Sequence, residues 1–121
     1  MERDPNGFDS KTPGSKLDAG KSPVLQGALQ YFPRALRAVS DVSFFGAKKY
    51  SWKGWESVPD GINRYGNAQV RHLLDETTGG PFALDSGMLH AAHGAWNALA
   101  RLELILKELE TNKAVLEDKN D

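Results

Sequence analysis

An apolar side chain recurs at every third or fourth position between residues 89 and 109. The members of this stripe are Leu89, Ala92, Trp96, Leu99, Leu102, Leu106 and Leu109. The spacing predicts an amphipathic helix that is capped by Asp85 or Ser86 and extends to Leu109 or beyond. Such a helix is roughly 36 Å long, more than a small domain needs, so we expect its surplus end to pack against another subunit. Beyond Thr111 charged residues become frequent, and we expect the helix to fray or end there.

Two earlier segments show the same helical spacing. The first runs from Leu25 to Phe45, where Pro33 should start or kink the helix and Gly46 should end it. The second runs from about Ile62 to Glu76 and is expected to end at the run from Thr77 to Pro81. Its predicted buried side carries Val70, Leu73 and Leu74.

These patterns predict an all-α fold, a small helical bundle with a long third helix that completes its core as a homo-oligomer. The 121 residues are enough for one domain. We expect a polar N-terminal arm that can be disordered (residues 1–22), a helical domain (23–110) and a charged C-terminal tail (111–121). The chain has no cysteine, no apolar run that could span a bilayer and no apolar leader segment. We therefore expect a soluble, unexported, cytoplasmic protein.

The charges are distributed unevenly along the chain. Residues 26–74 hold seven cations against three anions, whereas residues 75–121 hold nine anions against four cations, and the formal net charge is −1. A protein that binds long nucleic acids usually carries an overall basic excess. The pattern favours a local anion site over a surface for long nucleic acids or membranes.

The segment from Lys48 to Trp55, called here the basic aromatic segment, combines cations with flat rings. Its lysines are Lys48, Lys49 and Lys53, and its aromatic residues are Tyr50, Trp52 and Trp55. Lysines supply point charges for phosphate, and aromatic faces can stack on a base for about 1–3 kcal/mol. The combination suits a nucleotide. The alternative interpretation is that the tryptophans plug one end of the bundle while the lysines are solvated.

Polar stripes follow the second and third predicted helices. The second helix carries Arg64, Arg71 and His72, and the third carries His90, His93 and Asn97. If the two helices are antiparallel neighbours, these stripes could form a cleft in which arginine binds phosphate and histidine or asparagine contacts a base or ribose. The histidines could also hold a metal with Asp75, or could simply be satisfied structural residues.

Several of these motifs, in this order, resemble a phage domain family labelled the N-terminal domain of dATP/dGTP diphosphohydrolases. The likeness covers about residues 17–106. It rests on Gly20-Lys21-Ser22-Pro23, Gly46-Ala47-Lys48-Lys49-Tyr50, Trp55, Arg71-His72-Leu73-Leu74, and the run from Asp85 to His93 with Asn97. The family tends to show Asn-Trp-Arg where this chain has Gly54-Trp55-Glu56, so an anion stands in place of a cation.

The resemblance and the residues together leave three functions open. In related chains the domain can be joined to a MazG-like module with paired Glu-x-x-Glu and Glu-x-x-Asp carboxylates that bind Mg²⁺, and no such pair occurs in this sequence. The first hypothesis is therefore a phage sponge that sequesters nucleotide second messengers of antiviral defence, such as cyclic oligonucleotides or cyclic ADP-ribose isomers, without catalysis or cofactor. The second is a dATP/dGTP diphosphohydrolase that releases dNMP and pyrophosphate, with a divalent metal held by Asp75, Glu76 or Asp85 and the histidines. A third is a partner-binding helical protein with the third helix as its interface.

Overall fold

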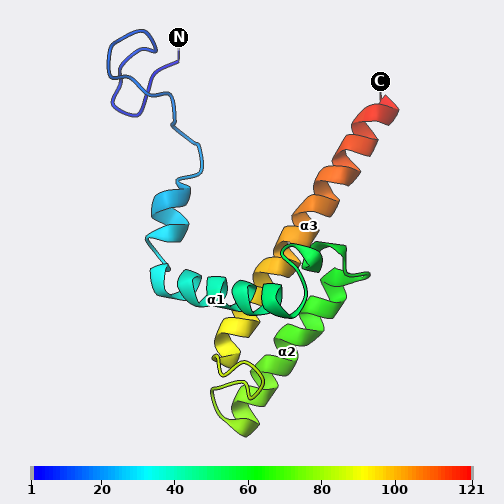
Figure 1. Cartoon of the computed structure of the whole chain (residues 1–121). Helices are drawn as coiled ribbons and strands as arrows, with labels where there is room; N and C mark the ends of the chain where they lie inside the picture. The colour runs from blue at the N-terminus through cyan, green and yellow to red at the C-terminus, as the bar shows by residue number, and fades with distance from the viewer. Residues whose placement is uncertain (1, 121) are drawn as a thin grey trace. The chain divides into compact units, whose positions relative to one another are not determined.

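The predicted all-α fold is confirmed by the computed structural model, which describes residues 2–120. The chain divides into two compact units, residues 1–33 and 34–121, and each is described by itself. The described residues form no named strand, and pairing between extended segments is limited to the isolated bridges Arg3–Asp9 and Phe82–Leu89. Figure 1 shows the order of the helices along the chain.

Asp4 organises the beginning of the first unit. Its carboxylate is buried and accepts hydrogen bonds from the backbone N–H groups of Asn6, Phe8 and Lys16, at 2.9–3.1 Å. Three N–H donors on one carboxylate are strong, charge-assisted bonds. The polar arm therefore contains a defined set of turns. The unit ends in a short π-helical turn, η1 (Leu25–Leu29).

The first predicted helix is interrupted, and it ends later than expected. Helix α1 (Pro33–Lys49) begins at Pro33, as predicted, and η1 precedes it as a separate turn. The prediction that Gly46 ends the helix is wrong, because the Gly46 carbonyl accepts a hydrogen bond from the Tyr50 N–H at 2.8 Å. A glycine inside a helix costs only about 1 kcal/mol relative to alanine. As a result, Lys48 and Lys49 lie in the last turn of α1, where the helix dipole favours cations.

A 3₁₀ turn, η2 (Gly54–Ser57), connects α1 to α2 (Gly61–Gly79). The run from Thr77 to Pro81 ends the helix, as predicted, although the helix extends through Thr77 and Thr78 to Gly79. Both hydroxyls donate to the carbonyl of Leu74 and remain within the helix. The chain leaves the helical conformation at Gly80, whose φ of 95° suits glycine.

The predicted buried side of α2 is also wrong. Val70, Leu73 and Leu74 are exposed by 55%, 64% and 59%. The side that packs on α3 instead carries Gly61, Tyr65 and His72. A Cβ at Gly61 would lie 2.8 Å from Leu104 Cδ1, so the missing side chain allows the two helices to approach closely.

Helix α3 (His90–Asn120) begins later and ends later than predicted. Asp85 and Ser86 do not cap it. They lie in a tight turn in which the Ala83 carbonyl accepts the Gly87 N–H and Gly87 has a φ of 73°. The expected end near Thr111 is wrong as well. Ala, Leu, Glu and Lys favour helix in the last turns, and Lys113 lies 4.0 Å from Glu117 at i, i+4.

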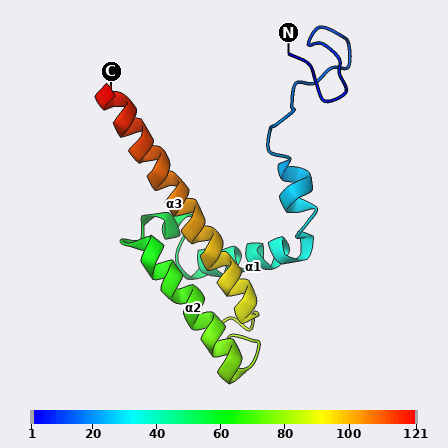
Figure 2. The same cartoon turned by 180° about the vertical axis from the view of Figure 1, so that it is seen from behind.

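Helices α2 and α3 pack side by side, and α1 lies against them (Figures 1 and 2). The core of the second unit is small. Its buried apolar residues are Val42, Ala83, Ala92 and Ala100. No helix among the described residues is both long and apolar enough to cross a bilayer.

Candidate functional site

A cleft of about 1090 Å³ opens between α1, the segment that follows it, α2 and the first turns of α3. Most of the residues singled out in the sequence line it. They are Lys49, Tyr50, Trp52, Trp55, Arg64, Arg71, His72, His93 and Asn97. The other two, Lys48 and His90, are not among the lining residues. The cleft therefore unites the basic aromatic segment with the polar stripes of the two helices.

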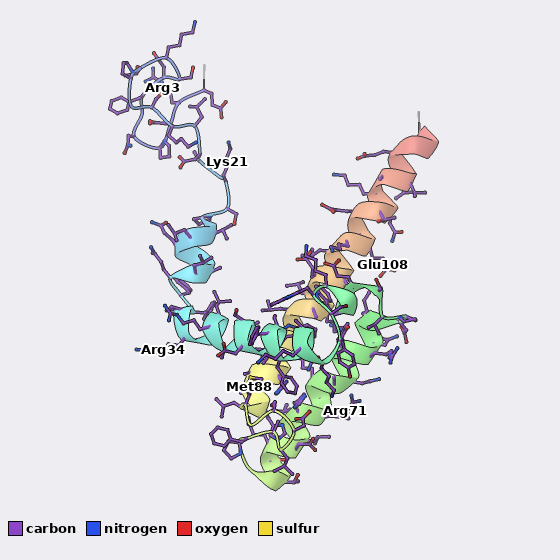
Figure 3. All side chains as sticks on the ribbon, in the orientation of Figure 1. Arg3, Lys21, Arg34, Arg71, Met88 and Glu108 are labelled. Carbon is purple, nitrogen blue, oxygen red and sulfur yellow. The ribbon has the colours of Figure 1, made fainter. Side chains whose placement is uncertain are left out.

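Four cations line the cleft, namely Lys49, Lys53, Arg64 and Arg71. Arg71 lies on α2, as Figure 3 shows. Ion pairs in the described part of the chain join Lys107 to Glu56 and Lys113 to Glu117, so none of the four cleft cations is paired with a carboxylate. Asp85 is the one acidic residue among the described lining residues. The wall of the cleft is therefore positively charged.

Lys48 has a different environment from its neighbour Lys49. The Lys48 Nζ lies 4.3 Å from the centre of the Phe44 ring, one turn earlier on α1. The Lys49 Nζ lies 5.5 Å from the ring centre of Tyr50, which itself lines the cleft. Lys49 therefore lines the cleft, whereas Lys48 carries the same charge outside the lining and can serve as a matched control.

The three aromatic residues of the segment have two different roles. Tyr50 and Trp52 are 76% and 67% exposed, and their ring faces can accept a base. The Trp55 ring instead packs edge to face on Tyr65 and Trp96, at 6.2 and 5.8 Å between centroids. Its backbone carbonyl also accepts the Tyr65 hydroxyl at 2.8 Å. Trp55 lines the cleft as part of a packed aromatic cluster.

Three histidines meet between α2 and α3. The Nδ1 atoms of His72 and His90 are 2.9 Å apart, so one donates and the other accepts, and this contact requires at least one neutral ring. The His72 and His93 rings stack at 4.7 Å with 7° between their planes. His90 is buried behind His72 and supports it from outside the cleft.

Burial lowers the pKa of two of these rings, His72 and His93. It lowers the pKa of His72 below the usual value, and the neighbouring His93 and His90 lower it further, against the opposing charges of Asp75 and Asp85. Burial also lowers the pKa of His93. Two neutral imidazoles therefore face the cleft at neutral pH and offer hydrogen bonds without adding charge.

Ser86 fixes the orientation of His93. Its hydroxyl lies 2.7 Å from His93 Nε2 and accepts the Met88 N–H at 3.1 Å. The hydroxyl can donate to Nε2 or accept from it, and in either case the bond ties the turn before α3 to the His93 ring.

Asn97 lines the cleft one turn beyond His93, and only 6% of it is exposed. No side-chain hydrogen bond in the described part of the chain involves its carboxamide, and no side-chain N or O atom there is both fully buried and without a partner. The polar atoms of Asn97 therefore still reach the open space of the cleft. The Asn97 side chain is thus available to a ligand in the cleft.

The anion that departs from the family pattern is directed away from the cleft. Glu56 Oε1 lies 3.2 Å from Lys107 Nζ on α3, and Glu56 is not among the lining residues. The positive wall therefore keeps its charge despite the glutamate next to Trp55.

Sequence reasoning missed several lining residues, among them Ser43, Tyr65, Asn67 and Trp96. Tyr65 precedes His72 by two turns on the same side of α2, so its spacing was a usable signal. Trp96 was assigned to the apolar stripe, and nothing in its spacing indicates that its Nε1 donates to Ser43 Oγ at 2.9 Å.

The metal alternative lacks a cluster of ligands in the described residues. Among the residues whose side chains the structure describes, no group of three or more His, Cys, Asp or Glu is arranged so that it could hold a metal ion.

The fold and the cleft define a small all-α protein with a positively charged, aromatic cleft between its helices. Its sequence matches the family described as dATP/dGTP diphosphohydrolase, N-terminal, over residues 11–114. The chain belongs to this family. No curated protein and no solved structure matches it.

Proposed function

We propose that the cleft binds an anionic nucleotide and sequesters it without hydrolysis. The observation that carries this proposal is the set of four cleft cations, Lys49, Lys53, Arg64 and Arg71, which have no carboxylate partner in the described residues. Cations placed in this way favour phosphate groups over neutral ligands.

The remaining lining residues fit the other parts of a nucleotide. The exposed rings of Tyr50 and Trp52 offer stacking surfaces for bases. The Asn97 carboxamide and the neutral rings of His72 and His93 offer hydrogen bonds to a base edge or a ribose. Every part of a nucleotide thus has a complementary group in the cleft.

The volume favours a ligand larger than one mononucleotide. Pockets for drug-sized ligands run from about 300 to 1,000 Å³, and this cleft measures about 1090 Å³. A cyclic dinucleotide, a cyclic trinucleotide or a cyclic ADP-ribose isomer is of suitable size and charge. We therefore propose that the protein acts as a phage sponge in the bacterial cytoplasm and depletes such second messengers of antiviral signalling.

Native mass spectrometry of the protein purified from bacteria, followed by calorimetry, tests this proposal. We expect a co-purified nucleotide, or binding tighter than micromolar to at least one of these cyclic nucleotides. The released ligand should be chemically unchanged. If no cyclic nucleotide binds more tightly than micromolar, the proposal is wrong.

The second candidate function is hydrolysis of dATP or dGTP to the monophosphate and pyrophosphate. The family description favours it, and so does Asp85, a carboxylate that lines the cleft together with His72 and His93. Incubation with each dNTP and Mg²⁺, Mn²⁺ or Co²⁺ separates the two functions. Release of monophosphate supports the enzyme, and intact triphosphate under every condition rejects it.

A further inference from the structure

Helix α3 has two faces with different surroundings. His93, Asn97 and Ala100 lie on the face that packs on α2, and all three are buried. On the opposite face, roughly 180° around the helix axis, runs a second line of residues, called here the seam. The seam consists of Leu99, Leu102, Leu106, Leu109, Lys113 and Leu116.

The seam is uncovered. Its five leucines are 46–61% exposed. In both views the later half of α3 extends beyond the N-terminal end of α2 (Figures 1 and 2), and Figure 3 labels Glu108 in this half. A contiguous row of half-exposed leucines on a soluble chain marks an interaction site.

The spacing of the seam specifies a helical partner. Its residues alternate at intervals of three and four, which is the a and d pattern of a coiled coil with Leu99, Leu106 and Lys113 at a. Each such residue inserts between four residues of a facing helix with the same period. A second copy of α3 has the same spacing because it has the same sequence.

The charges beside the seam oppose a membrane as the occupant. Glu103, Glu110 and Glu117 follow one edge of it at the e positions. Anionic headgroups would repel this row of carboxylates. At the edge of a coiled coil, glutamates are common and remain solvated.

We propose that the seam of α3 pairs with the seam of a second copy to form a homodimer. The paired length from Leu99 to Leu116 is about 26 Å. Fewer than three heptads is short for a coiled coil, so the dimer dissociates on dilution. This pairing is independent of the ligand, because the cleft residues lie on the other face of α3.

Sedimentation equilibrium of the full chain over a wide concentration range tests the dimer. We expect a mass that rises from 13.3 kDa to twice that value. The double variant L106E/L109E should raise the dimer dissociation constant by about 100-fold or more, since it removes four leucines from the paired seams and adds four carboxylates. T111E, a glutamate at an f position outside the seam, should leave the constant within about threefold. A chain that is monomeric throughout, or an unchanged constant in L106E/L109E, overturns the proposal.

Cysteine crosslinking gives a second readout that needs no destabilising charge. The chain has no native cysteine, so each engineered thiol is unique. With the seam in register, L106C crosslinks to itself in a parallel dimer, and L106C crosslinks to L109C in an antiparallel one. Either product under mild oxidation supports the seam, and T111C should give neither. Absence of both seam products, or equal crosslinking of T111C, contradicts the proposal.

Discussion

The imidazole rings of His72 on α2 and His93 on α3 are stacked, with 4.7 Å between their centroids and 7° between their planes. Stacked rings at this separation cannot both carry a positive charge without strong repulsion. The contact therefore depends on pH.

Acidification should destabilise the protein. Burial lowers the pKa of both His72 and His93 in the folded state. The unfolded chain binds protons with a pKa of about 6.5, so between that value and the lower folded pKa it holds more protons than the folded chain. The contribution of the two histidines to the free energy of unfolding is therefore fully present above about pH 6.5, and it is lost as the pH drops below that value. Urea unfolding at pH 7.5 and pH 5.5 measures the loss. H72Q/H93Q should show a smaller difference between the two pH values, and equal losses in both proteins would exclude the histidines as the cause.

The two tryptophans of the basic aromatic segment should respond differently to truncation. W55A opens a void beside Tyr65 and Trp96 and should cost about 2–3 kcal/mol, somewhat less than a fully buried tryptophan. W52A removes an exposed ring and should change stability by no more than about 0.5 kcal/mol. Thermal and chemical unfolding compare the two variants. Equal stability losses would mean that Trp55 is not part of the core.

The adjacent lysines give a matched pair for ligand binding. K49A removes a cleft cation and should weaken nucleotide binding about tenfold or more, the equivalent of a charge-assisted hydrogen bond of about 1.5–3 kcal/mol. K48A removes the same charge one position earlier, outside the lining, and should weaken binding by a factor of about two or less. Calorimetry at two salt concentrations separates the local contact from general screening. If K48A and K49A weaken binding equally, only the overall charge matters.

Replacement of Asn97 by leucine should separate stability from binding. Because the Asn97 carboxamide has no hydrogen-bond partner in the described residues and its polar atoms still reach solvent, N97L breaks no hydrogen bond within the protein and should change stability by no more than about 1 kcal/mol. Nucleotide affinity should fall about tenfold. Unfolding midpoints and titration of the same preparation test both halves. A large loss of stability would show that the amide is needed by the fold rather than by a ligand.

The sequence predicted which elements exist better than where they end. The period of 3.6 residues identified the three α-helices, because it requires only that one face of each helix be apolar. Helix α1 does not end at Gly46, because the Gly46 carbonyl still accepts a helical hydrogen bond. The exposed side of α2, with Val70 and Leu73, was taken for the buried one. Periodicity reports that an apolar stripe exists and not what covers it.

For the candidate site, too, the sequence predicted local spacing along a helix but not the contacts between elements. Spacing brought His90, His93 and Asn97 together correctly, because neighbours at i+3 and i+4 share a helix face. It could not reveal that Ser86 contacts His93, nor that the Tyr65 hydroxyl reaches the Trp55 carbonyl. Both contacts join a turn to a helix, and their geometry depends on tertiary packing that has no sequence period.

Helix α3 is one unbroken element from His90 to Asn120. Asn97 at the floor of the cleft and Leu116 near the far end are about 28 Å apart along its axis. A continuous helix of this length is nearly rigid and bends only gently. A probe attached near Leu116 should therefore stay at a nearly constant distance from Asn97, whether or not the cleft holds a ligand.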